Sequence, residues 1–167
     1  MSWRVRLRLF GLALVVVGLG GCYLRDAYRS SLRPPSSVEP REYVVVTTGY
    51  CPCSECCGWT RNWWGRPTYA SGPLRGKAKK VGQTASGAMA KPGTIAADTS
   101  IFPFGTVMYV PGYGYGRVED RGGDIKGYHI DLFYRTHSAA LQHGRYREGV
   151  KVWLPEDLRG GKIPGTR

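Results

Sequence analysis

The sequence has no long stretch of apolar residues at 3.6-residue spacing, and no internal repeat is visible along it. These two absences argue against a mainly helical chain and against a repeat architecture. The 24 glycines and 11 prolines among the 167 residues divide the chain into short segments instead. The composition therefore predicts a single turn-rich domain that is mostly β-structure.

Acidic residues are scarce. The chain carries 12 of them against 24 lysines and arginines, which gives a formal net charge of +12. A surplus this large implies a polyanionic partner: nucleic acid, an anionic membrane face or an acidic cell-wall polymer. Charge alone does not choose among the three.

The apolar run near the start of the chain is too short to span a bilayer comfortably as a helix. It extends from Leu9 to Gly21, and three arginines precede it. This pattern predicts a signal peptide over residues 1–21. The run ends in Leu-Gly-Gly before Cys22, which resembles a bacterial lipobox, so we expect Cys22 to be lipidated; an ordinary signal peptide with an incidental cysteine is the alternative. Export predicts a lipid-anchored, periplasm-facing protein of the cell envelope, at the outer membrane, with no nucleic-acid partner.

Composition divides the rest of the chain into three parts. Residues 22–41 are rich in serine and proline and predict a flexible tether. We expect the folded domain over residues 42–155 and a C-terminal tail over residues 156–167. Within the domain, short β-branched segments predict strands at 43–48, 94–97, 106–110, 115–119, 128–134 and 149–154. Thr136 and Gly144 are typical caps of a short helix between them. Six strands and one helix suggest a small barrel with a long Cys- and Trp-rich loop from Cys51 to Gly93.

Asp131 interrupts an otherwise apolar strand. Because side chains alternate along a strand, Asp131 points away from Ile130 and Leu132 and shares a face with His129 and Phe133. A carboxylate among such neighbours is costly to bury unless it is paired or lines a cleft. Asp131 therefore indicates a carboxylate-lined groove.

Two further aspartates end predicted strands. Asp120 is followed by Arg121 and the pair Gly122-Gly123, which lets the backbone pass close to another chain or a ligand. Asp98 follows the strand 94–97. Taken by itself, Asp98 is most simply interpreted as a turn cap.

Several ordered segments resemble the 3D domain, a family named for its three aspartates. They are Thr94-Ile95-Ala96-Ala97-Asp98, Ile101 to Thr106, Gly112-Tyr113-Gly114, Glu119 to Gly127 and Ile130-Asp131. The resemblance implies a six-stranded double-psi β-barrel and assigns the family's aspartates to Asp98, Asp120 and Asp131. This sequence departs from the family at Arg121 and Asp124, where threonine and alanine are usual, so substrate contacts at this turn are expected to differ.

The resemblance also implies an activity, because the family includes lytic transglycosylases and small muralytic proteins. We expect cleavage of peptidoglycan glycan strands with formation of 1,6-anhydro-muramic ends, by a monomer that needs no cofactor. Asp131 is the expected acid and then base, with Asp120 and Asp98 beside it. Two other readings stay open: a non-catalytic wall-polysaccharide-binding module, and a metal or redox sensor built on the cysteines.

Five other residues are candidates for substrate contact. Lys126 and Arg121 are able to hold carboxylates of the wall polymer. Gly122 allows close approach, His129 shares the face of Asp131, and Thr84 is a candidate hydrogen-bond donor.

The segment from residue 51 to residue 57 holds four cysteines: Cys51, Cys53, Cys56 and Cys57. In an exported protein an even number favours disulfides, although the spacing is awkward for pairing. A metal site is the second alternative, but the cluster offers one knuckle where zinc sites draw on two. Free thiols are the third. Nearby, Trp59, Trp63 and Trp64 are able to stack on sugar rings or to pack under the loop. His137 and His143 are expected to be surface or cap residues.

Overall fold

The computed structural model describes residue 29 and residues 31–159. The expected signal peptide, the lipidation site Cys22, the first part of the tether and the last part of the tail lie outside these residues. No helix within the described part is long and apolar enough to cross a membrane.

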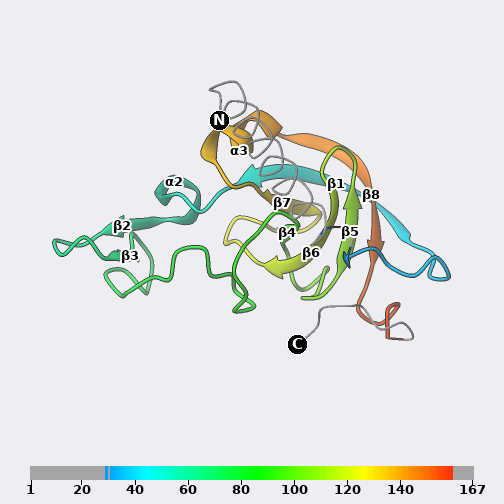
Figure 1. Ribbon diagram of the computed structural model, residues 1–167, viewed down its shortest axis with the longest axis horizontal. Coiled ribbons are helices and arrows are strands. Elements are labelled where there is room, and N and C mark those ends of the chain that lie inside the picture. The colour runs from blue at the N-terminus through cyan, green and yellow to red at the C-terminus, as the bar shows by residue number, and fades with distance from the viewer. Residues whose placement is uncertain (1–28, 30, 160–167) are drawn as a thin grey trace, which may run out of the picture.

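Six strands form a closed barrel (Figure 1). Around the barrel the strands follow the order β1, β7, β4, β6, β5, β8. The predicted mainly β fold with a six-stranded barrel is confirmed, and each predicted strand lies within a few residues of an observed one. The strands are β1 (Arg41–Tyr50), β4 (Thr94–Ala97), β5 (Val107–Val110), β6 (Gly114–Asp120), β7 (His129–Phe133) and β8 (Tyr146–Trp153).

Two strand pairs in the barrel are parallel. β1 pairs with β7, and β4 pairs with β6, while the remaining neighbours are antiparallel. Strand β7 lies between β1 and β4, and both pairings join segments that are distant in the sequence. Together they fix which side chains of β7 point into the barrel and which point outward. Ile130 and Leu132 of β7 are fully buried in the core with Val45, Val118 and Phe102. The apolar residues at alternate positions therefore fill the barrel, as their spacing predicts.

The one predicted helix is α3 (His137–His143), which begins at the N-cap Thr136 and ends at Gly144. The Thr136 hydroxyl accepts a hydrogen bond from the Ala139 amide at 3.2 Å, as an N-cap side chain does. Helix α3 packs closely on β1 at Gly49. A Cβ added to Gly49 would lie 2.7 Å from the Ala140 carbonyl oxygen, so only glycine allows this approach.

The loop expected between Cys51 and Gly93 contains structure that the sequence did not predict. It holds the short helix α2 (Ser54–Cys57) and a two-stranded hairpin of β2 (Trp59–Arg61) and β3 (Pro67–Tyr69). These elements extend to one side of the barrel as an arm (Figure 1). We use the name arm for residues 54–69. Each strand has three residues, too few to show an alternating pattern.

The described part of the expected tether lies on the barrel. Leu32 is fully buried, and the Trp153 indole donates a 2.9 Å hydrogen bond to the Val38 carbonyl. The tail contacts the barrel too: Leu158 is buried, and Asp157 accepts a 2.7 Å hydrogen bond from Arg41. The described residues of the expected tether and tail therefore contact the folded domain, because isolated apolar side chains in both segments cover apolar surface.

Candidate active site

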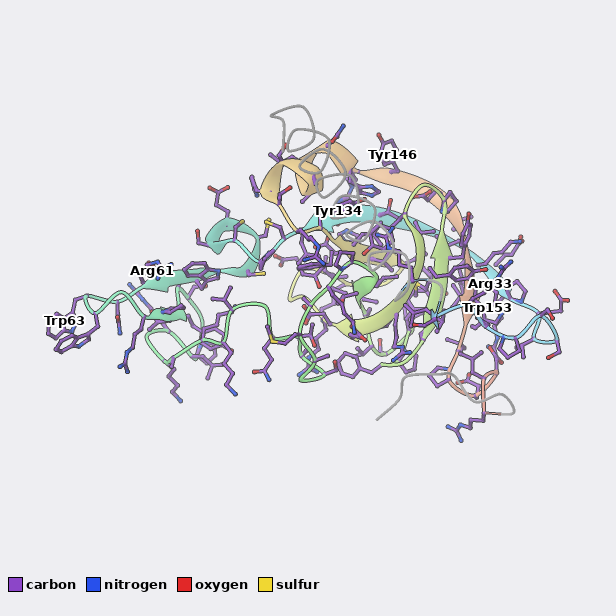
Figure 2. All side chains as sticks on the ribbon, viewed as in Figure 1. Arg33, Arg61, Trp63, Tyr134, Tyr146 and Trp153 are labelled. Carbon is purple, nitrogen blue, oxygen red and sulfur yellow. The ribbon has the colours of Figure 1, made fainter. Side chains whose placement is uncertain are left out.

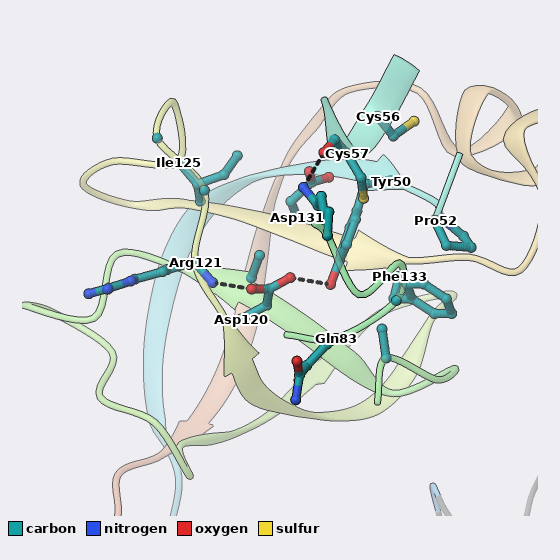
Figure 3. Close-up of a pocket in the computed structure, with 16 residues that line it drawn as sticks. Tyr50, Pro52, Cys56, Cys57, Gln83, Asp120, Arg121, Ile125, Asp131 and Phe133 are labelled. Atoms are coloured by element: carbon teal, nitrogen blue, oxygen red, sulfur yellow. Dashed lines mark hydrogen bonds between the residues drawn. The ribbon is translucent and has the colours of Figure 1, made fainter. Parts of the chain in front are cut away.

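A groove of about 300 Å³ opens between the barrel and the base of the arm (Figure 3). The ends of β1, β6 and β7 form its barrel side, and residues from the start and the end of the long loop form its other side. Its wall includes Tyr50, Pro52, Cys56, Cys57, Lys79, Gln83, Ala96, Asp120, Arg121, Gly122, Gly123, Ile125, Asp131 and Phe133.

Asp131 reaches the groove from the middle of β7. Its register partners are Thr48 on β1 and Ala96 on β4. Phe133, two residues further on, lines the same groove, whereas Ile130 points into the core. The structure thus places Asp131 on the groove side, as the alternation along this strand predicts.

Asp131 is half-buried, and its surroundings favour the protonated carboxyl. Burial raises its pKa from 3.8 to about 6, and the negative charge of Asp120 acts in the same direction. The Thr48 hydroxyl opposes them, because it donates a 2.8 Å hydrogen bond to Oδ1 and so favours the ionised form. The result is a carboxyl group that exchanges its proton close to neutral pH, which suits an acid–base catalyst.

His129 is connected to Asp131 through Thr48. The Thr48 Oγ1 lies 2.9 Å from His129 Nε2. Because the Thr48 hydroxyl donates to Asp131, it accepts from His129, and the proton of the imidazole is therefore on Nε2. Burial lowers the pKa of His129, with Arg145 adding to the effect. His129 does not line the groove itself, so its position supports the network behind Asp131.

Asp120 lies at the end of β6 and faces the same groove as Asp131 (Figure 3). Three donors hold its carboxylate. The Tyr50 hydroxyl donates to Oδ2 at 3.2 Å, and the backbone amides of Ala85 and Arg121 both donate to Oδ1 at 2.9 Å. These three hydrogen bonds hold the side chain of Asp120 in one orientation toward the groove.

Asp98 does not line the groove. Its Oδ1 accepts a 2.7 Å hydrogen bond from the Ser100 hydroxyl, and its Oδ2 accepts a 3.0 Å hydrogen bond from the Gly127 amide. These donors lower the pKa of Asp98 to about 2. Asp98 joins the end of β4 to the turn that precedes β7. Asp98 therefore caps a turn, which is the simplest interpretation of this residue from the sequence.

The remaining predicted contact residues divide into two groups. Arg121 and Gly122 line the groove. Lys126 is exposed beside Asp98, and Thr84 is buried with its hydroxyl bonded to the Ala88 carbonyl at 3.1 Å. Thr84 therefore shapes the loop whose Ala85 amide reaches Asp120, and it does not face the groove.

Sequence reasoning missed four groove or network residues: Thr48, Tyr50, Lys79 and Gln83. Tyr50 is buried, and burial together with the charge of Asp120 raises its pKa, so it stays a hydrogen-bond donor. Lys79 donates to the Cys57 carbonyl and brings a positive charge to the wall of the groove. The alternation along β1 was a usable signal for Thr48 and Tyr50, since both lie on the side of the strand opposite Val45 and Thr47.

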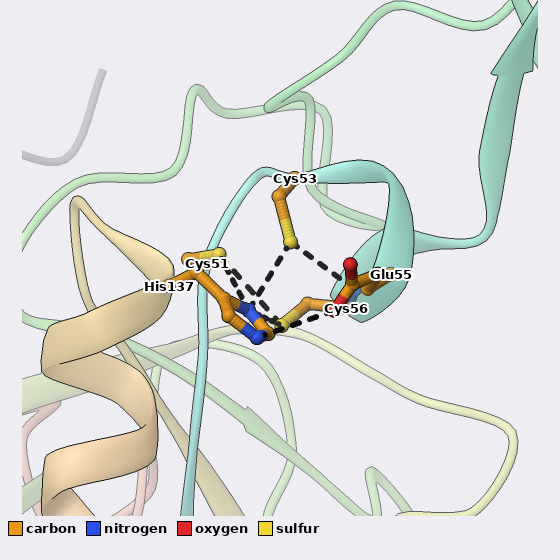
Figure 4. A network of polar contacts seen from close by, with 5 residues as sticks. All are labelled: Cys51, Cys53, Glu55, Cys56 and His137. Atoms are coloured by element: carbon orange, nitrogen blue, oxygen red, sulfur yellow. Dashed lines mark hydrogen bonds and ion pairs between the residues drawn. The ribbon is translucent and has the colours of Figure 1, made fainter.

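The four clustered cysteines are all free thiols in the structure. The sulfur atoms of Cys51 and Cys56 are 3.7 Å apart, well beyond the ~2.05 Å of a disulfide. Three of the thiols converge on His137 instead (Figure 4). The disulfide alternative favoured by the sequence is therefore not formed here, and His137 is more than a surface or cap residue.

Two of the three tryptophans are exposed at the far end of the arm. Trp63 and Trp64 are 81% and 68% exposed, and their ring centroids are 3.5 Å apart. Figure 2 shows Trp63 at the tip, away from the barrel. Trp59 is half-buried at the base, where its indole donates to the Pro52 carbonyl at 3.0 Å. Of these three tryptophans, only Trp59 packs within the loop, as one of the two alternatives from the sequence predicts.

The fold and the groove define a small closed β-barrel with two carboxylates facing one cavity. Residues 93–155 match the model of the 3D domain. This segment covers β4 to β8 and carries Asp98, Asp120 and Asp131. The resemblance to this family that the sequence shows is therefore confirmed over these residues.

Two proteins of Bacillus subtilis (strain 168) are similar to part of the chain. The cell wall-binding protein YocH is 43% identical over 58 residues, and YabE, provisionally named a cell wall shaping protein, is 38% identical over 58 residues. Each match covers 35% of this chain, and it spans only 20% of YocH and 14% of YabE.

The chain is also similar to crystal structures of MltA from Escherichia coli, which are described as showing a unique lytic transglycosylase fold. The likeness has 25% sequence identity and a TM-score of 0.36, and it covers 42% of this chain and 26% of MltA. A second MltA structure, an apo form of a variant, gives 26% identity and a TM-score of 0.36.

Proposed function

We propose that the protein acts on the bacterial cell wall and cleaves the glycan strands of peptidoglycan as a lytic transglycosylase. The observation that carries the proposal is the half-buried carboxyl group of Asp131, which faces the groove with a pKa of about 6 beside Asp120. A glycosidic bond needs a proton on its leaving oxygen, and such a group supplies one near neutral pH.

In the proposed reaction, Asp131 protonates the glycosidic oxygen as the bond from C1 of N-acetylmuramic acid breaks. The 6-hydroxyl of the same sugar then attacks C1, and its proton passes to Asp131. The ring closes to a 1,6-anhydro end, Asp131 is protonated again, and no water is consumed. One carboxyl group thus serves as acid and as base, whereas ordinary glycosidases use two.

Asp120 has a separate task in this scheme. Positive charge develops at C1 in the oxocarbenium-like transition state. The carboxylate of Asp120 is held by Tyr50 and two backbone amides, so it is already oriented when that charge appears. A preorganised charge of this kind stabilises the transition state without further reorganisation.

The basic wall of the groove suits an acidic polymer. Arg121 and Lys79 both line the groove. Peptide stems and lactyl groups of peptidoglycan carry carboxylates that such side chains bind. The 3D-domain match and the cell-wall names of YocH and YabE agree with this substrate, and a protein that acts on it works in the envelope or outside the cell.

Digestion of purified sacculi tests the proposal. The intact protein is expected to release muropeptides with 1,6-anhydro ends, identified by mass spectrometry, and Asp131→Ala to release none. Asp124→Ala is the matched control, because Asp124 is an exposed aspartate in the loop between β6 and β7 and does not line the groove. Products with reducing ends would mean hydrolysis, and an absence of any released product would reject cleavage altogether.

A non-catalytic wall-binding role is the second candidate. It is favoured by the exposed pair Trp63 and Trp64, because aromatic faces stack on sugar rings, and by the similarity to YocH, which is named a cell wall-binding protein. Binding of sacculi without released product would support this role over the enzyme.

A further inference from the structure

We propose that Cys51, Cys53, Cys56 and His137 bind one Zn²⁺ ion in a closed tetrahedral site that fixes the base of the arm to the barrel. The site does not depend on whether the groove cleaves glycan. Its ligand atoms are three thiolate sulfurs and Nδ1 of the imidazole, which all lie within 4.8 Å of one another (Figure 4).

The distances among these atoms fit a tetrahedron around zinc. With Zn–S bonds of ~2.3 Å and Zn–N bonds of ~2.0–2.1 Å, the ligand atoms are expected about 3.8 Å apart for two sulfurs and about 3.5 Å apart for sulfur and nitrogen. The two sulfurs of Cys51 and Cys56 are 3.7 Å apart. Nδ1 of His137 lies 3.5 Å from the sulfurs of Cys53 and Cys56 and 3.9 Å from that of Cys51.

The ligands come from two distant parts of the chain, which resolves the objection that the cysteines form a single knuckle. Cys53 and Cys56 form a Cys-x-x-Cys turn at α2, and the Cys56 amide donates to the Cys53 sulfur at 3.4 Å. Cys51 lies directly after β1. His137 is the first residue of α3, more than 80 positions further on.

A carboxylate behind His137 sets the imidazole in the tautomer that a metal needs. Nε2 of His137 lies 3.2 Å from Oε2 of Glu55, so Nε2 carries the proton and donates it to Glu55. Nδ1 is then a free lone pair that points at the three sulfurs. Metal-binding histidines regularly donate their second nitrogen to a carboxylate in this way.

The fourth clustered cysteine is turned away from the site. The Cys57 thiol donates to the Cys51 carbonyl at 3.2 Å, and Cys57 lines the groove. Three cysteines and one histidine therefore complete the coordination, which leaves no open position for substrate. A closed site of this kind is structural, and its zinc adds stability to the fold.

The position of the site connects it with the groove. The groove wall includes Cys56, which is one of the proposed ligands, and Pro52 and Cys57, which are next to ligands in the sequence. The metal joins the end of β1, helix α2 and the start of α3 at one point. We therefore expect it to hold this wall in place over Tyr50 and Asp131.

Metal analysis of the purified full chain, prepared under reducing conditions, tests the site. We expect about one equivalent of zinc, and on replacement by Co²⁺ the intense d–d absorption of a tetrahedral thiolate site. Cys53→Ser and His137→Ala are expected to lose most of the bound metal. Cys57→Ser is the matched control and is expected to keep one equivalent, because its sulfur lies outside the site.

The Co²⁺ spectrum of the unmutated protein keeps the proposal falsifiable even if a ligand variant does not fold. Protein that contains no zinc and gives no tetrahedral Co²⁺ spectrum would overturn the site, and so would an equal loss of metal in Cys57→Ser. Glu55→Gln is expected to weaken metal binding by about tenfold, since it alters only the group behind the histidine. Sacculus cleavage is measured separately, so failure of either proposal leaves the other testable.

Discussion

The Thr48 hydroxyl of β1 donates a 2.8 Å hydrogen bond to Oδ1 of Asp131 on the neighbouring parallel strand. This contact is the main stabilising partner of the ionised carboxyl group, while burial and Asp120 favour the protonated one. The balance between the two sides sets the pH at which Asp131 loses its proton, and each side can be altered separately.

Removal of the hydroxyl is expected to extend cleavage to higher pH. Asp131 has to be protonated to act as the acid, so the rate falls as pH rises through its pKa of about 6. Thr48→Val removes the bond that favours the carboxylate, and the alkaline limb of the rate profile should move up by about 0.5–1 pH unit. Thr48→Ser keeps the hydroxyl and should leave the limb in place.

Asp120→Asn should move the same limb in the opposite direction. The substitution removes the negative charge that raises the pKa of Asp131, so this pKa falls. Asp131 then loses its proton at a lower pH, and the rate declines from that lower pH onward. The maximal rate should also fall by about 10-fold or more, because the charge facing C1 is lost. Rate profiles against pH on soluble glycan strands measure both effects. A limb that shifts upward would contradict the arrangement.

Asp131→Asn is expected to stabilise the fold at neutral pH. The pKa of Asp131 is raised from 3.8 to about 6 in the folded state. Asp131 therefore does not lower the stability of the fold below about pH 4, and it lowers it increasingly as the pH rises to about 6. The variant's gain in free energy of unfolding over the unmutated protein should therefore be larger at pH 7 than at pH 4. The difference between the two gains should be up to about 2–3 kcal/mol. Denaturant titrations at the two pH values test this, and a difference independent of pH would refute it.

Asp98→Asn should act on stability with the opposite pH dependence. The pKa of Asp98 is lowered to about 2 by its hydrogen bonds, so the stability it supplies is present above about pH 4 and is lost as pH falls through 2. We expect a lower melting temperature at pH 6 that approaches the unmutated value near pH 2. Cleavage should be reduced but not abolished, because Asp98 positions the turn before β7 without lining the groove.

The exposed pair at the tip of the arm is expected to bind glycan. The double substitution Trp63→Ala with Trp64→Ala should weaken pelleting with sacculi several-fold. The free energy of unfolding should change by about 0.5 kcal/mol or less, because both rings are exposed. Tyr146→Ala is the control: Tyr146 is an exposed aromatic residue on β8, away from the arm in Figure 2. Equal loss in the control would show a non-specific effect.

The strands were predictable because each combines β-branched residues with clear turns, and the helix was predictable from Thr136 and Gly144. The orientation of Asp131 followed from alternation alone. Alternation along β1 places Thr48 and Tyr50 on one side of that strand, but it does not show which residues they bond. Their contacts with Asp131 and Asp120 depend on the long-range pairing of β1 with β7 and of β4 with β6 and β7. The contact of His137 with the cysteines was not predictable for a similar reason, because it joins two segments that are distant in the sequence and that the folded barrel brings together.

The arm was not predictable from the sequence. Its strands have three residues each, too few for an alternating apolar pattern, and the rings of Trp63 and Trp64 at its tip are exposed. No periodicity and no run of core residues therefore indicates it. The burial of Leu32 was hidden in the same way, because one apolar side chain in a serine- and proline-rich segment carries no pattern.

The barrel closes through β1, β7, β4, β6, β5 and β8 without any strand from residues 51–93. That whole segment leaves the barrel after Tyr50 and returns at Thr94, with both of its ends beside the groove. The arm, in the middle of this segment, takes part in none of the barrel's strand pairs, whereas the Ala85 amide near the end of the segment orients Asp120. Changes at the tip of the arm can therefore alter which polymer is bound while the hydrogen bonds of the carboxylates are kept.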